Sequence, residues 1–124
     1  MNDTIFALAT PPGRSGVAVL RVSGPYAWAG AQYLSGHAPG VGHPRLTHLK
    51  NPATKETIDR ALILAFKGPR SYTGEDIIEY HVHGGRAVID SLILALSAQN
   101  HHRMAEPGEF TRRAFENGKL DLTE

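Results

Sequence analysis

One short stretch of the sequence carries three side chains that could do chemistry on a single surface. It reads Ile-Ile-Glu-Tyr-His-Val-His over residues 77–83. This alternation is typical of a strand, in which successive side chains point to opposite faces. Glu79, His81 and His83 therefore share one face. Arg21 intrudes on an otherwise apolar face of a second alternating segment, so Arg21 and Glu79 could form a structural ion pair or jointly line a cleft.

The two histidines allow a metal-dependent alternative. His81 and His83 stand at i and i+2 on one strand face, which is the spacing of two metal ligands, and Glu79 is a conceivable third. A His-x-His pair on a strand is more often solvated or hydrogen-bonded. We therefore predict no metal site and keep a metal-dependent enzyme as the alternative.

No motif in the sequence points to catalysis. A phosphate-binding GxxxxGK[ST] loop is absent, and Gly40-Val41-Gly42 lacks the third glycine of a dinucleotide fingerprint. Serine, histidine and aspartate residues cannot be assembled into a catalytic triad from their order alone. We therefore predict no catalytic residue within these 124 residues.

Composition indicates a single domain, and the absence of cysteine is consistent with a reducing compartment. A chain of 124 residues can bury one core without the help of disulfides, and it contains no cysteine. The formal net charge of +1 provides no basic field that would by itself indicate nucleic-acid binding. The N-terminus fits neither a signal peptide nor a membrane span of about 20 apolar residues. We expect a cytoplasmic protein without a membrane contact.

Hydrophobic periodicity predicts strands interleaved with helices. Strands are expected at 4–10, 17–22, 45–49, 58–66, 77–83 and 104–107, and helices at 25–34, 86–98 and 107–117. The nearly continuous apolar run within 58–66 predicts a central strand buried on both faces, and 99–103 is expected to be a polar break. The fold class is α+β, a mixed sheet with helices packed mainly on one face.

Seven ordered blocks together resemble the N-terminal domain of the bacterial tRNA-modification GTPases of the MnmE family, also called TrmE. They cover nearly the whole chain except 37–57. The blocks are Asp3-Thr4-Ile5, Ala9-Thr10-Pro11-Pro12-Gly13-Arg14, the segment 16–24 with Leu20-Arg21-Val22-Ser23-Gly24, Tyr72-Thr73-Gly74-Glu75-Asp76, His83-Gly84-Gly85, Pro107-Gly108-Glu109-Phe110-Thr111 and Asn117-Gly118-Lys119-Leu120-Asp121-Leu122.

The resemblance implies that the chain is part of a longer protein. Residues 1–118 would form a folate-binding and dimerisation domain, similar to the tetrahydrofolate-binding module of aminomethyltransferases, and 119–124 would begin a helical and GTPase region. GTP, Mg2+ and K+ would bind only in that further region. Family members act with the flavoprotein MnmG on C5 of the wobble uridine of tRNA. A homodimer is therefore expected, with MnmG and tRNA as partners of the full-length protein.

The resemblance also implies where a folate binds. The folate-contacting residues of the family map onto Arg21, Glu79 and Lys119, and the expected ligand is 5-formyltetrahydrofolate or a related one-carbon tetrahydrofolate. A carboxylate such as that of Glu79 can accept hydrogen bonds from both the ring N–H and the exocyclic amino group of a pterin. The alternative is a structural dimerisation domain whose ligand site is vestigial.

Overall fold

The computed structural model describes residues 3–10 and 16–119. Within these residues the chain forms six strands and three helices. They are β1 (Thr4–Leu8), β2 (Val17–Ser23), α1 (Ala27–Ser35), β3 (Arg45–Lys50), β4 (Thr57–Phe66), β5 (Ile77–His83), α2 (Arg86–Ser97), β6 (His102–Met104) and α3 (Glu109–Glu116). The predicted α+β class is confirmed. Arg14 and the 120–124 part of the predicted further region lie outside the described residues.

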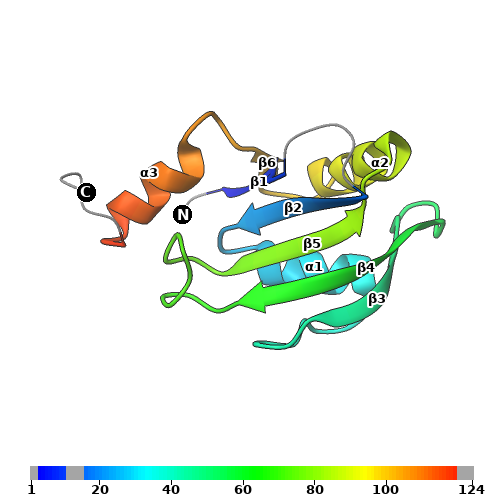
Figure 1. Cartoon of the computed structure of the whole chain (residues 1–124), viewed down its shortest axis with the longest axis horizontal. Coiled ribbons are helices and arrows are strands. Elements are labelled where there is room, and N and C mark those ends of the chain that lie inside the picture. Colours follow the sequence, from blue (N-terminus) through cyan, green and yellow to red (C-terminus); the bar gives the residue numbers. More distant parts are fainter. Residues whose placement is uncertain (1–2, 11–15, 120–124) are drawn as a thin grey trace.

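All six strands belong to one mixed sheet, in the order β3-β4-β5-β2-β1-β6. Neighbouring strands are antiparallel, except that β1 and β6 run parallel. Figure 1 shows β5 and β2 side by side in the middle of this sheet. The side chains that alternate along β2 and β5 therefore determine the character of both sheet faces.

Helices α1 and α2 cover one face of the sheet and lie behind the strands in Figure 1. Between these layers the core is almost entirely aliphatic. The sheet contributes Leu20, Val22, Ile78, Tyr80 and Val82, and the helices contribute Ala27, Ala31, Leu34, Leu92 and Leu96. Burial of each large apolar side chain stabilises the fold by about 1.5–3 kcal/mol. The prediction that helices pack mainly on one face is correct.

Strand β4 differs from the strand predicted over 58–66. It lies next to the edge strand β3, and only alternate residues of its apolar run are buried. Leu62 and Phe66 are exposed on the sheet face opposite α1 and α2, with relative exposures of 42% and 41%. The apolar run of β4 has apolar side chains on both faces of the strand, but helices cover only one of these faces.

Strand β6 begins earlier than predicted. The sequence predicts a polar break over 99–103, whereas His102 and Arg103 already pair with Thr4 and Ile5 of β1. This pairing uses main-chain groups, with the Thr4 N–H donating to the carbonyl of His101 at 2.7 Å. Side-chain polarity does not reveal such pairing, because the backbone groups of every residue type can form it.

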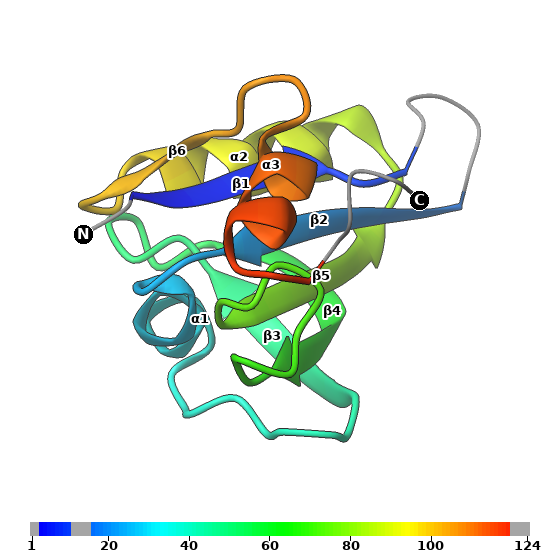
Figure 2. The same cartoon turned by 90° about the vertical axis from the view of Figure 1, so that its left-hand side faces the viewer.

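Helix α3 lies apart from the two-helix layer, close to the loop that joins β4 to β5 (Figures 1 and 2). Its buried face consists of Glu109, Arg113 and Ala114, so charged side chains hold this helix in place. Within residues 3–10 and 16–119, no helix has the length and apolar content needed to cross a membrane.

Candidate functional site

Arg21 and Glu79 meet on the sheet face that α1 and α2 leave open. They are direct partners in the register of β2 and β5, and Nε and Nη2 of Arg21 each lie 2.9 Å from Glu79 Oε2. The Glu79 side chain is 16% exposed and that of Arg21 is 36% exposed. The sequence left open whether these residues pair or line a cleft, and in the structure they do both.

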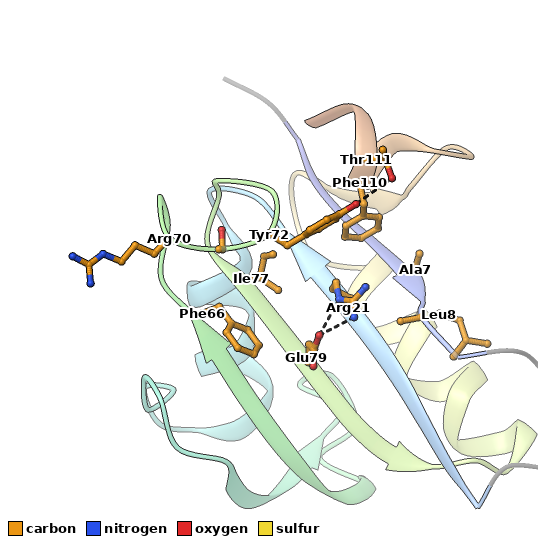
Figure 3. Close-up of a pocket in the computed structure, with 12 residues that line it drawn as sticks. Ala7, Leu8, Arg21, Phe66, Arg70, Tyr72, Ile77, Glu79, Phe110 and Thr111 are labelled. Carbon is orange, nitrogen blue, oxygen red and sulfur yellow. Dashed lines mark hydrogen bonds and ion pairs between the residues drawn. The ribbon is translucent and has the colours of Figure 1, made fainter. Parts of the chain in front are cut away.

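A cavity of about 570 Å³ opens above this ion pair, within the usual range of small-molecule sites. Its lining comes from β1, β2, β4, β5, the β4–β5 loop and α3. The residues are Ala7, Leu8, Ala9, Arg21, Phe66, Arg70, Ser71, Tyr72, Ile77, Glu79, Phe110 and Thr111. Figure 3 shows Arg21 and Glu79 between aromatic side chains, with Phe66 on one side and Tyr72 and Phe110 on the other. The site thus combines one charged pair with largely apolar walls.

His81 and His83 serve different carboxylates. His81 Nε2 lies 3.1 Å from Glu79 Oε1, whereas His83 Nδ1 lies 2.8 Å from Asp59 Oδ1, and the His83 ring is largely exposed. Across the described residues, no group of three or more His, Cys, Asp or Glu side chains is placed to hold a metal ion. The three-ligand set of the metal-dependent alternative is therefore not assembled.

A buried charge network fixes the wall that α3 contributes. Glu109, only 1% exposed, accepts hydrogen bonds from Arg103 Nη1 and Nη2 at 2.8 and 2.6 Å and from Arg113 Nη2 at 3.3 Å. The hydrogen bonds from Arg103 lower the pKa of Glu109 to about 2 and raise the pKa of Arg103. Arg113 also donates to both oxygens of Glu75, at 3.1 and 3.2 Å. The network thereby joins α3 to β6 and to the β4–β5 loop.

The β4–β5 loop is held between the sheet and α3. The hydroxyl of Ser23 on β2 lies 2.7 Å from that of Thr73 and donates to Glu75 Oε1 at 2.8 Å. Asn117, just after α3, donates to the carbonyl of Thr73 at 2.8 Å. Where the loop meets α3, the hydroxyl of Tyr72 lies 3.2 Å from that of Thr111 (Figure 3). These contacts bring the aromatic side chains of Tyr72 and Phe110, from distant parts of the sequence, to the same side of the cavity.

Lys119, the third predicted ligand residue, is not among the cavity-lining residues. It is exposed and follows a Schellman turn at the end of α3. The N–H groups of Gly118 and Lys119 donate to the carbonyls of Phe115 and Ala114, at 3.0 and 2.8 Å, and Gly118 adopts φ 75°. The structure therefore brings Arg21 and Glu79 together and places Lys119 beyond the helix that forms the cavity wall.

Sequence reasoning missed the network of Arg103, Glu109, Arg113 and Glu75, and the aromatic walls. One signal was available, because Glu109 and Arg113 are spaced i and i+4 and such pairs meet on one face of a helix. Nothing in the sequence marked this face as buried. The aromatic residues Phe66, Tyr72 and Phe110 occur in three separate segments, and their convergence depends on the packing of α3.

Comparison with known proteins relates the chain to one family. The family described as "GTP-binding protein TrmE N-terminus" matches residues 4–119. The tRNA modification GTPase MnmE of Caulobacter vibrioides is 56% identical over 124 residues, covering 100% of this chain and 27% of the relative. That of Parvibaculum lavamentivorans is 53% identical, covering 98% and 28%.

A human relative, the mitochondrial 5-taurinomethyluridine-[tRNA] synthase subunit GTPB3, is 50% identical over 123 residues, covering 98% of this chain and 25% of the relative. The chain therefore spans 25–28% of the length of these three relatives. The family match covers nearly all of the described residues, including Arg21 and Glu79. The chain belongs to the TrmE N-terminal family of tRNA-modification GTPases.

Proposed function

We propose that this chain is the folate-binding and self-associating N-terminal domain of a cytoplasmic tRNA-modification GTPase. Its ligand is 5-formyltetrahydrofolate or a related one-carbon tetrahydrofolate. The observation that carries this proposal is the Arg21–Glu79 pair at a cavity with aromatic walls. A reduced pterin has a planar pyrimidine ring with adjacent N–H donors and a carbonyl acceptor, fused to a puckered, largely apolar reduced ring, so it suits this combination of charge and apolar surface.

Each part of the site has a role in this proposal. Glu79 accepts hydrogen bonds from the ring N–H and the exocyclic amino group of the pterin, because a carboxylate has two oxygens in one plane. Arg21 and Lys119 bind carbonyl or carboxylate oxygens of the ligand. Phe66, Tyr72 and Phe110 offer apolar surface to the ring and to the aminobenzoyl group. Charge-assisted hydrogen bonds thus orient the ligand, and the walls exclude water from them.

The chemistry of the whole protein is assigned to the longer family member. The relatives are named as tRNA modification GTPases or as a subunit of a tRNA-modifying synthase. In the proposed reaction the one-carbon group of the folate is used, together with the flavoprotein MnmG, to modify C5 of the wobble uridine. Hydrolysis of GTP, with Mg2+ and K+, takes place in a domain other than the one formed by these residues.

The open face of the sheet supports self-association. Leu46 and Leu62 are paired across β3 and β4 and are 49% and 42% exposed, and Phe66 is 41% exposed on the same β4 face. Exposed apolar side chains gathered on one face of a sheet are typical of an interaction surface. This face also carries the cavity. A second copy on it would cover the bound folate and shield the polar contacts from water.

Calorimetric titration of the chain with 5-formyltetrahydrofolate tests the ligand assignment. The Glu79→Gln variant keeps the side-chain shape but loses the charge, and it should weaken binding by about 1.5–3 kcal/mol, the usual contribution of a hydrogen bond to a charged group. Unchanged affinity would remove Glu79 as the pterin anchor. A wild-type chain that does not bind would favour a structural dimerisation domain with a vestigial site.

A further inference from the structure

We propose that His81 is a positioning residue that holds the carboxylate of Glu79 in the plane required by the pterin. This inference rests on the proposed folate site and names a residue beyond the three assigned to it. The His81 Nε2 to Glu79 Oε1 distance is 3.1 Å, on the oxygen that Arg21 does not contact. The two side chains therefore hold the carboxylate from both of its oxygens.

The torsion that His81 controls is the softest one in the glutamate side chain. Rotation about the last bond of a glutamate is broad and roughly two-fold, because it joins a tetrahedral to a planar carbon. Both nitrogens of Arg21 reach Oε2 alone, so the guanidinium fixes the place of one oxygen. A second hydrogen bond, on Oε1, is needed to define the plane of the carboxylate.

The number of acceptor positions indicates why this second contact matters once the ligand is bound. A carboxylate offers about four lone-pair positions. Two pterin donors, the Arg21 Nε–H and His81 would together fill all four, because Arg21 donates one hydrogen bond, from Nε, and its Nη2 is a close ion-pair contact. Arg21 and His81 would then each keep a contact to Glu79 in the complex, and the contact from His81 is the one on Oε1.

The neighbours of His81 in the sheet do not compete with Glu79 for its ring nitrogens. The register places Val19 of β2 and Leu62 of β4 beside it, and both are apolar. Its side chain is 28% exposed, compared with 73% for His83. An ionised carboxylate can only accept a hydrogen bond, so Nε2 of His81 must carry a proton. This condition is met by the neutral Nε2–H tautomer as well as by the charged ring.

His83 provides a matched comparison on the same strand face. It also pairs with a carboxylate, since its Nδ1 lies 2.8 Å from Asp59 Oδ1. Asp59 and His83 do not line the cavity. Substitution of His83 therefore removes a His–carboxylate contact of the same kind without touching the proposed site.

The experiment is a double-mutant cycle measured by calorimetry with 5-formyltetrahydrofolate. His81→Met, which keeps bulk but has no donor, should raise Kd about 3- to 10-fold, the effect of losing one net hydrogen bond. His81→Gln retains an N–H donor and should recover most of the affinity. His83→Met should bind like the wild type. In the Glu79→Gln background, His81→Met should cause little additional loss, because the carboxylate that it positions is gone.

The outcomes separate this inference from the folate site on which it rests. Equal losses from His81→Met with and without the Glu79 carboxylate would show that the two residues act independently and would overturn the positioning role. An unchanged Kd in His81→Met would overturn it as well, while leaving the folate site in place. A wild-type chain without affinity for the folate would overturn the site itself and the role of His81 with it.

Discussion

Arg21 and Glu79 are direct cross-strand neighbours, and both guanidinium contacts reach the same carboxylate oxygen. Nε and Nη2 of Arg21 each lie 2.9 Å from Glu79 Oε2. A bidentate guanidinium, which donates one hydrogen bond to each carboxylate oxygen, would leave fewer acceptor positions free. The observed pairing is asymmetric, so Arg21 holds the carboxylate but leaves its second oxygen to His81 and to a ligand.

Replacement of Arg21 distinguishes a binding site from a structural ion pair. Arg21→Met should change the free energy of unfolding by about 1 kcal/mol or less, because partly exposed ion pairs contribute little to stability. It should weaken folate binding by about 1.5–3 kcal/mol if the guanidinium contacts the ligand. Urea denaturation and calorimetry provide the two values. Arg86→Met is the control, because Arg86 forms an exposed pair with Asp90. A large loss of stability with unchanged affinity would identify a structural pair.

The Glu109 network should make stability depend on pH in the acid range. The pKa of Glu109 is lowered to about 2, chiefly by the hydrogen bonds from Arg103. A lowered carboxyl pKa contributes stability that is present above the ordinary pKa of about 4.5 and is lost as the pH falls toward 2. Glu109→Gln should cost about 3 kcal/mol near neutral pH, since it removes one partner from a buried ion pair.

Urea denaturation over this pH range measures the effect. The difference in stability between wild type and Glu109→Gln should shrink as the pH falls, and Glu116→Gln, at the exposed end of the same helix, should behave like the wild type. A difference that stays constant with pH would mean that the charge of Glu109 is not responsible.

The hydroxyl of Tyr80 should be dispensable. It is fully buried and finds no hydrogen-bond partner among the described residues, and burial raises its pKa far above the ordinary value. An unsatisfied buried polar group costs about 1–3 kcal/mol, so Tyr80→Phe should leave stability unchanged or increase it by about 1 kcal/mol. Thermal and urea denaturation test this. A clear loss of stability would mean that the hydroxyl has a partner in solution.

The turn after α3 should determine the position of Lys119. Gly118 and Gly36 both end helices with positive φ, 75° and 84°, and a Cβ at either would meet open space. Alanine at each position should therefore cost a similar amount, about 1 kcal/mol, from the left-handed backbone alone. Only Gly118→Ala should also reduce folate affinity, because only this turn directs Lys119. Equal affinities in the two variants would remove Lys119 from the proposed site.

Charge placed on the open sheet face should disrupt self-association. Leu62→Glu introduces a carboxylate among exposed apolar side chains, and its desolvation would oppose burial of this face against a second copy. Sedimentation should show a shift toward monomer. Leu94→Glu is the control, because Leu94 is 68% exposed on α2, away from this face. A wild-type chain that is monomeric throughout, or a dimer that tolerates Leu62→Glu, would contradict the proposed surface.

Local sequence patterns determined most of the secondary structure. Alternation along β2 and β5 placed Arg21 and Glu79 on the faces where the structure shows them, because side chains in a strand alternate regardless of what packs around them. The helix predicted over 107–117 likewise ends close to the observed end of α3, at Glu116. Gly118 follows with φ 75°, a left-handed conformation that glycine adopts readily and that commonly ends helices. Such signals depend on neighbours in the sequence, so they can be read before the fold is known.

Contacts between distant segments were decided only by the tertiary structure. The β2–β5 register puts Arg21 opposite Glu79, and the choice between a pair and a cleft required the wall contributed by α3. The exposure of Leu62 could not be predicted from the sequence. An apolar run shows which residues can be buried, but it does not show whether a layer of helices covers them. The burial of Glu109 and Arg113 also depends on the tertiary structure. Their charges predict a solvated helix face, whereas opposite charges from β6 and the β4–β5 loop make burial of that face favourable.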